Sequence, residues 1–121
     1  MVTALLVVVC GGLGAIARFL VDTIVQSRRL GEFPMGTFIV NTGGCLLLGL
    51  LVGLQAPHRA TVVIGTALIG SYTTFSTWML ETHRPAQEGE PPIAWSNILF
   101  GLAAGLLAVT AGRRLGVLIG G

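Results

Sequence analysis

The chain has 121 residues, of which 53% are hydrophobic and 10% are charged, and its formal net charge is +2. Soluble domains usually contain about 25% charged residues, so the composition excludes an ordinary soluble domain and indicates a membrane protein. The positive charge is also too small and too dispersed to indicate nucleic-acid binding. Cys10 and Cys45 each lie in an apolar window without a neighbouring cysteine or histidine, so neither a disulfide framework nor a cysteine metal site is expected.

Four windows of the sequence carry no charged residue, and each is long enough to cross a membrane. A spanning helix needs about 20 mainly apolar residues. We therefore expect an all-α membrane protein whose four transmembrane helices form one domain over residues 1–121. The helices are expected near residues 3–26, 34–55, 60–82 and 93–111. The first lacks a basic leader and a cleavage site, so we expect it to be retained rather than removed as a signal peptide.

The first two helices carry few polar residues, and their spacing is informative. In the first, Arg18 stands four residues before Asp22, a spacing that allows an ion pair on one helix face. In the second, Thr37 and Asn41 are also four residues apart and share a face. A buried asparagine amide needs a hydrogen-bonding partner in lipid. That partner is either another helix or a bound ligand.

The third helix contains the most informative stretch, residues 70–78, which read GSYTTFSTW. Hydrocarbon offers hydroxyl and backbone groups no hydrogen-bonding partner, so such polarity is tolerated only where it faces protein, ion or water. Threonine and serine side chains can instead bond back to carbonyls of their own helix. Phe75 and Trp78 lie three residues apart on one face, where rings can simply pack. The stretch is the first candidate for the functional part of the chain.

The fourth helix repeats the problem of a buried amide at Asn97. Its Gly101 and Gly105, like Gly49 and Gly53 of the second helix, are four residues apart. This spacing lets membrane helices approach closely and predicts packing. The sequence contains no carboxylate pair, no serine–histidine–aspartate set and no phosphate-binding loop. We therefore expect no enzymatic activity.

Arginines are balanced between the two sides of the predicted bundle, so their count predicts no orientation of the chain in the membrane. The positive-inside rule normally orients a protein by the excess of Lys and Arg in its short loops. One side carries Arg59, Arg113 and Arg114, and the other carries Arg28, Arg29 and Arg84. Copies inserted in both directions would be related by a two-fold axis in the membrane plane. Gly70 falls near mid-depth, where a helix break would bring carbonyl oxygens of two chains together as a cage for a small hard cation.

Three motifs together resemble the Fluc/CrcB family of fluoride channels. Residues 11–18 read GGLGAIAR, residues 34–44 read PMGTFIVNTGG, and residues 65–78 read GTALIGSYTTFSTW. The chain length, the four spans and the balanced arginines agree, so the resemblance covers nearly the whole chain. The TTFST core within a hydrophobic span is a specific signal, whereas the glycine motif of the first helix alone is weak.

The resemblance implies an antiparallel, dual-topology dimer with two fluoride pathways, a break in the third helix and a central sodium ion that is structural and not transported. The sodium ligands would be the main-chain carbonyls of Gly70 and Thr73. The pathway residues that it implies are Asn41, Phe75, Trp78, Thr37, Ser76, Thr77 and Asn97. Arg18 would act electrostatically in the vestibule, or would only pair with Asp22. The implied location is the cell membrane, in bacteria the inner membrane.

The sequence departs from the family pattern at several positions. Trp78 replaces the usual second phenylalanine, and Ser71 and Tyr72 stand where glycine and leucine are typical. Asn97 and Gly101 occupy positions where tyrosine and serine are common. These departures affect the shape of the expected anion path. They would also fit one subunit of a heterodimer of paralogous chains, as an alternative to a homodimer.

Two other functions stay open on the sequence. A small proton-coupled drug exporter also has four helices, but it needs a titratable carboxylate deep in the membrane. The acidic residues here all lie at or near the ends of the expected spans: Asp22, Glu32, Glu81, Glu88 and Glu90. Alternatively, the chain is a non-conducting partner that only completes a heterodimeric fluoride channel.

Overall fold

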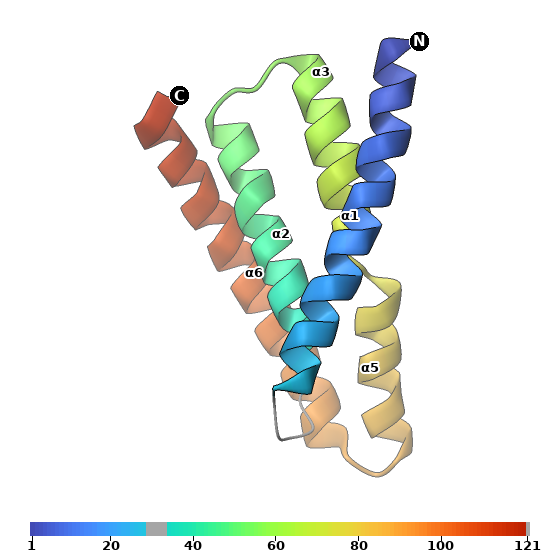
Figure 1. Cartoon of the computed structure of the whole chain (residues 1–121). Helices are drawn as coiled ribbons and strands as arrows, with labels where there is room; N and C mark the ends of the chain where they lie inside the picture. The colour runs from blue at the N-terminus through green and yellow to red at the C-terminus, as the bar shows by residue number, and fades with distance from the viewer. Residues whose placement is uncertain (29–33, 121) are drawn as a thin grey trace.

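The computed structural model describes residues 1–28 and 34–120, and every element within them is a helix. In chain order the elements are α1 (Val2–Ser27), α2 (Met35–Gly53), α3 (His58–Ala60), the π-helix η1 (Thr61–Ile69), α4 (Gly70–Tyr72), α5 (Ser76–Gln87) and α6 (Pro91–Gly120). Figure 1 shows the N- and C-termini at the same end of the bundle, with the turn between α5 and α6 at the opposite end. Arg29 and Glu32, which enter the sequence-based charge counts, lie outside the described residues.

Three helices, α1, α2 and α6, are each long and apolar enough to cross a membrane by length and composition. The segment expected as the third helix, residues 60–82, is divided among α3, η1, α4 and α5. Thr73 has an extended backbone with a ψ of 161°, and α5 begins only at Ser76. The helical path is therefore interrupted over residues 73–75, which we call the interruption. These shorter pieces follow one another along the bundle, so four helical passes fit the expected architecture (Figure 1).

The contact between α2 and α6 is the most extensive between any two helices, and glycines lie at its centre. A Cβ atom at Gly49 would meet the backbone carbonyl of Val109, and one at Gly112 would meet that of Leu46. Gly53 likewise faces the backbone of α6. In lipid, helices associate largely through van der Waals packing, which small interface residues permit. The packing role predicted for Gly49 and Gly53 is therefore confirmed.

Helix α1 crosses the bundle and touches η1, α4 and α2 (Figure 1). Gly14 is buried there, and a Cβ atom on it would meet the backbone oxygen of Leu68 and the hydroxyl of Ser71. A Cβ atom at Gly11 or Gly12 would instead meet nothing within 4 Å. Of the three glycines in the first motif, only Gly14 is needed for close packing against η1 and α4.

Two helices run further than the sequence predicted. α6 continues to Gly120, beyond the expected end at residue 111, and includes Arg113 and Arg114. Arginine is a good helix former, so these charges do not end the helix. α5 continues to Gln87, beyond the expected end at residue 82, and includes Pro85. A proline inside a helix lacks the N–H that would bond the carbonyl four residues earlier, so α5 tolerates one missing bond near its end.

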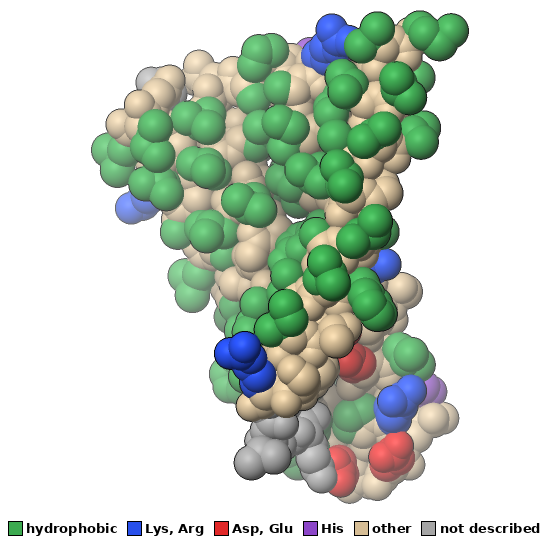
Figure 2. Space-filling view, in the orientation of Figure 1, with side chains coloured by type: hydrophobic (Ala, Val, Ile, Leu, Met, Phe, Trp, Pro, Cys, Tyr) green, Lys and Arg blue, Asp and Glu red, His purple; other side chains and the backbone are tan. Residues whose placement is uncertain are grey.

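Most charged side chains lie toward the ends of the molecule, whereas Arg18 lies within α1. Figure 2 shows hydrophobic side chains over most of the visible face and acidic ones gathered at the end that carries α5. The acidic residues of the described chain are Asp22 on α1, Glu81 on α5, and Glu88 and Glu90 in the turn before α6. Apolar flanks with charged ends are the distribution that a bilayer requires.

We expect Gly112→Ala to force α2 and α6 apart, because the added Cβ would meet the backbone of Leu46. The free energy of unfolding should fall by about 1–3 kcal/mol, the usual cost of overpacking. Unfolding of the purified protein in detergent, followed by circular dichroism, measures this change. Gly12→Ala is the matched control, since its Cβ meets nothing within 4 Å. Equal losses in both variants would contradict the packing argument.

Candidate functional site

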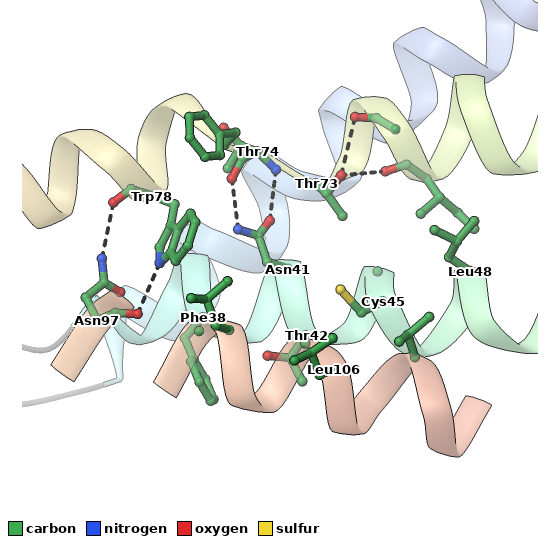
Figure 3. A pocket seen from close by; sticks show the side chains of 18 of the residues that line it. Phe38, Asn41, Thr42, Cys45, Leu48, Thr73, Thr74, Trp78, Asn97 and Leu106 are labelled. Carbon is green, nitrogen blue, oxygen red and sulfur yellow. Dashed lines mark hydrogen bonds between the residues drawn. The ribbon is translucent and has the colours of Figure 1, made fainter. Parts of the chain in front are cut away.

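Asn41 of α2 holds the backbone between α4 and α5. Its amide nitrogen donates to the carbonyl oxygen of Thr74 at 2.8 Å, and its side-chain oxygen accepts the N–H of Thr74, also at 2.8 Å. Figure 3 shows the two bonds side by side. Unpaired backbone groups are costly in an apolar environment. Asn41 therefore supplies both partners that Thr74 would otherwise find in a continuous helix.

Three hydroxyls cluster where α5 begins. The Thr74 hydroxyl accepts the backbone N–H of Thr77 at 3.2 Å, as an N-capping side chain does. It also donates to the Thr77 hydroxyl at 3.2 Å and lies 3.4 Å from the hydroxyl of Ser76. The N-terminus of a helix favours negative charge because its first N–H groups point outward. Neutral donors and a helix terminus thus coincide at this position.

The interruption leaves two carbonyl groups without a helical N–H partner. In a continuous α-helix the Gly70 carbonyl would accept the N–H of Thr74, but that N–H is bonded to Asn41. Within the described chain, the Gly70 oxygen has only the Thr73 hydroxyl nearby, at 3.5 Å, and no backbone N–H is bonded to the Thr73 oxygen. Gly70 is exposed and Thr73 is half-buried. Both oxygens are therefore free to accept a further partner.

Two aromatic rings flank the same segment. Phe75 and Trp78 meet edge to face, with ring centroids 5.8 Å apart and an angle of 72° between the planes. Phe75 is 69% exposed, whereas the Trp78 indole N–H donates to the Asn97 carbonyl at 3.1 Å. In such a contact the positively polarised edge of one ring meets the negative face of the other.

Asn97 of α6 is among the most buried residues, with 1% of its surface exposed. Its amide nitrogen donates to the Trp78 carbonyl at 3.2 Å and to the Thr82 hydroxyl at 2.7 Å. The Thr82 hydroxyl in turn donates to the Trp78 carbonyl at 2.9 Å. Thr82 is a site residue that the sequence reasoning missed. The sequence does contain a signal for it, because Thr82 follows Trp78 by four residues, about one helical turn.

Two cavities bring the predicted site residues together. The larger, about 470 Å³, is mainly apolar and lies between α2, α6 and the interrupted segment. Its lining includes these predicted residues: Asn41, Gly70, Thr73, Phe75, Trp78 and Asn97. Figure 3 shows this cavity. Thr74, within the interruption, lines both this cavity and a second, smaller cavity.

The smaller cavity, about 150 Å³, contains Arg18, Asp22, Thr37 and Thr77. Thr37 is 2% exposed, so its hydroxyl is a buried group. The ion pair considered between Arg18 and Asp22 is absent from the described residues, and one Asp22 carboxylate oxygen is buried without a hydrogen bond. Ser76 lines neither cavity, and its hydroxyl lies 3.4 Å from that of Thr74.

Apolar helices around this polar interruption define a multi-pass, all-α membrane protein. The chain belongs to the CrcB family, because the family model described as "CrcB-like protein, Camphor Resistance (CrcB)" matches residues 5–113. The family resemblance found in the sequence is thereby confirmed.

Curated relatives cover nearly the whole chain. A protein of Mycolicibacterium paratuberculosis named fluoride-specific ion channel FluC 2 is 43% identical over 113 residues, 93% of this chain and 93% of its own. The protein of the same name in Mycobacterium tuberculosis is 45% identical over 107 residues, covering 88% and 85%. A protein of Rubrobacter xylanophilus named fluoride-specific ion channel FluC 1 is 49% identical over 113 residues, covering 92% and 90%.

We expect Asn41→Ala to expose the Thr74 backbone, because it removes both bonds at once. Hydrogen exchange at the Thr74 amide, followed by mass spectrometry or NMR in detergent, should then accelerate at least about tenfold, as for loss of about 1.4 kcal/mol of protection. Thr42→Ala is the control, since the neighbouring Thr42 makes no hydrogen bond to this segment. Unchanged exchange in Asn41→Ala would show that the segment holds its shape without the side chain.

Proposed function

We propose that this chain forms a fluoride-selective passive channel that exports cytoplasmic fluoride and so lowers its toxicity. The observation that carries the proposal is the set of uncharged donors gathered around the interruption at Thr74. Three relatives that match most of the chain are named fluoride-specific ion channels, which supports the choice of ion. The proposed pathway residues are Asn41, Thr37, Ser76, Thr77, Phe75, Trp78 and Asn97, with Arg18 in the vestibule.

Neutral donors suit a small, strongly hydrated anion. A pore must replace the water around fluoride, yet conduction requires that the ion also leaves easily. A fixed cation in the narrow part would hold fluoride too tightly, whereas hydroxyl and amide hydrogens offer intermediate strength. Asn41 donates one amide hydrogen to Thr74, so the other stays available as a donor. The ring edges of Phe75 and Trp78 add weak positive polarity without trapping the ion.

Passive export is sufficient for the proposed role. Hydrogen fluoride enters a cell as a neutral molecule and ionises inside. The membrane potential, negative inside, then drives the anion outward at about 2.3 kcal/mol per 100 mV. Neither a coupling ion nor a nucleotide is needed. The corresponding location is the cell membrane, in bacteria the inner membrane.

We propose that two copies assemble in opposite orientations around a structural sodium ion. The donor chemistry fits such an ion, because hard cations prefer oxygen ligands and the carbonyls of Gly70 and Thr73 have no N–H partner. In lipid these oxygens would be costly unless another group satisfied them. When bound, sodium would supply the charge that holds carbonyl oxygens of two chains together. It is not transported.

A heterodimer is the alternative assembly, in which this chain conducts poorly or only completes a partner's pathway. The names of the relatives number them 1 and 2, which is compatible with paralogous chains. Purifying this chain alone and measuring fluoride efflux separates the two assemblies. Robust efflux would exclude a non-conducting partner.

One observation favours a second function, a proton-coupled exporter. One carboxylate oxygen of Asp22 and one of Glu81 are buried and make no hydrogen bond in the described chain. Asp22 lines the smaller cavity together with Thr74, whereas Glu81 lies on α5, beyond the interruption. A channel's fluoride flux follows voltage, whereas an exporter's flux follows the proton gradient, so flux across a pH-clamped membrane distinguishes them.

We expect Asn41→Asp and Phe75→Ile each to slow fluoride efflux from proteoliposomes by at least about tenfold. The first replaces an N–H donor with an acceptor of negative charge, and the second removes a polarised ring edge. A fluoride electrode measures the efflux, and size-exclusion chromatography checks that assembly is unchanged. Phe100→Ile, on the α6 surface outside both cavities, is the control. Wild-type efflux in both test variants would remove these residues from the pathway.

We expect sodium to stabilise the assembled dimer, because binding to the assembled state alone shifts the equilibrium toward it. Thermal dissociation in detergent should occur at a higher temperature in sodium chloride than in N-methylglucamine chloride at equal ionic strength. Chromatography after heating reports the fraction still assembled. Identical dissociation in the two salts would argue against the sodium site.

A further inference from the structure

We propose that Gly101 and Asn97 of α6 are positioning residues that hold the Trp78 indole out of the larger cavity and so set the width of the anion path. That an anion passes this ring rests on the proposed function. The placement of the ring does not depend on it. The family resemblance implied Asn97 as a residue of the fluoride pathway. The contacts assign it this different role.

A closed set of bonds joins Trp78 to α6. The indole N–H donates to the backbone carbonyl of Asn97 at 3.1 Å, and the side-chain amide of Asn97 donates back to the backbone carbonyl of Trp78 at 3.2 Å. Figure 3 shows both bonds between the two residues. Thr82 fixes the amide from a second side, accepting at 2.7 Å. The ring is thereby tethered at its polar edge, and the residue that tethers it is itself fixed.

These bonds use every donor that the pair could offer to an anion. An asparagine side chain has two N–H hydrogens, which here serve Trp78 and Thr82, and an indole has one, which serves Asn97. Neither side chain therefore has an N–H left for an ion. What Trp78 presents to the cavity is the remaining edge of its ring.

Gly101 provides the space into which the indole fits. A Cβ atom at position 101 would lie 2.9 Å from the indole nitrogen and 3.1 and 3.2 Å from two ring carbons. Carbon atoms do not approach a ring so closely, so a larger residue would push the indole away from α6. Trp78 and Gly101 both line the cavity of about 470 Å³. The displaced ring would move toward that space and away from its edge contact with Phe75.

The ring at position 78 and the small residue at 101 are thus coupled. A phenylalanine at 78 would be smaller and has no N–H, so it would leave room for a methyl group at 101. Gly101→Ala should therefore be harmful with tryptophan at 78 and tolerated with phenylalanine. A general requirement for glycine in α6 packing predicts equal harm in both backgrounds.

The test is a double-mutant cycle of wild type, Gly101→Ala, Trp78→Phe and the double variant, measured as fluoride efflux from proteoliposomes. We expect Gly101→Ala to slow efflux at least about tenfold in the tryptophan background and less than about twofold in the phenylalanine background. Equal slowing in both backgrounds, or no slowing in either, would overturn the proposal. Loss of folding in both backgrounds counts as equal slowing.

A second readout does not depend on ion flux. The chain has two tryptophans, and Trp95 is 62% exposed, so Trp95→Phe leaves Trp78 as the only indole emitter. In that background Gly101→Ala and Asn97→Leu should each shift the Trp78 emission maximum and increase its quenching by acrylamide. Gly105→Ala is the matched control for emission, because its Cβ would stand at an ordinary 3.4 Å from the Cys45 sulfur.

The two readouts separate the two proposals. If wild type carries no fluoride but Gly101→Ala still moves the Trp78 emission, the proposed function fails and the positioning role stands. If fluoride flux is robust and emission is unchanged in both Gly101→Ala and Asn97→Leu, the positioning role fails.

Discussion

The exchange of two hydrogen bonds between Asn41 and the backbone of Thr74 is the interaction on which the rest of the site depends. Hydrocarbon provides no alternative partner for a peptide group, so a helix can be interrupted in an apolar segment only where protein supplies one. A single amide side chain does so for both groups of Thr74. Because it takes the Thr74 N–H, the Gly70 carbonyl is left over, and the chain gains an acceptor on its surface.

The interruption also divides the site into two unlike spaces. On one side the smaller cavity is lined by two charged residues, Arg18 and Asp22, and by hydroxyls such as that of the buried Thr37. On the other, the larger cavity is lined mainly by carbon, with donors confined to a few positions. Thr74 lines both. Under the proposed function, an anion that leaves the charged groups of the first space would meet only neutral donors at the interruption, which suits easy release.

Much of this could be predicted from the sequence, because lipid makes polarity informative. Residues 70–78 stand out by composition alone, and the four-residue spacing of Thr37 and Asn41 places both on one face. The π-helix from Thr61 to Ile69 could not be predicted, since the apolar run there has no signal for its hydrogen-bond pattern. Nor could the partner of the Trp78 indole, which is a backbone carbonyl of a distant helix and leaves no trace in residue identity.

A tryptophan at position 78 has consequences that a phenylalanine would not have. The indole brings more ring area and also an N–H, which must find an acceptor in an apolar setting. Meeting that need against α6 requires a residue without a Cβ at 101 and an amide at 97 to hold the backbone of α5. As a result, the orientation of the indole ring is fixed by hydrogen bonds rather than by packing alone. Under the proposed function, the width of the anion path would then depend on the distance between α5 and α6. A change that separates these helices would alter conduction even where no proposed pathway residue is touched.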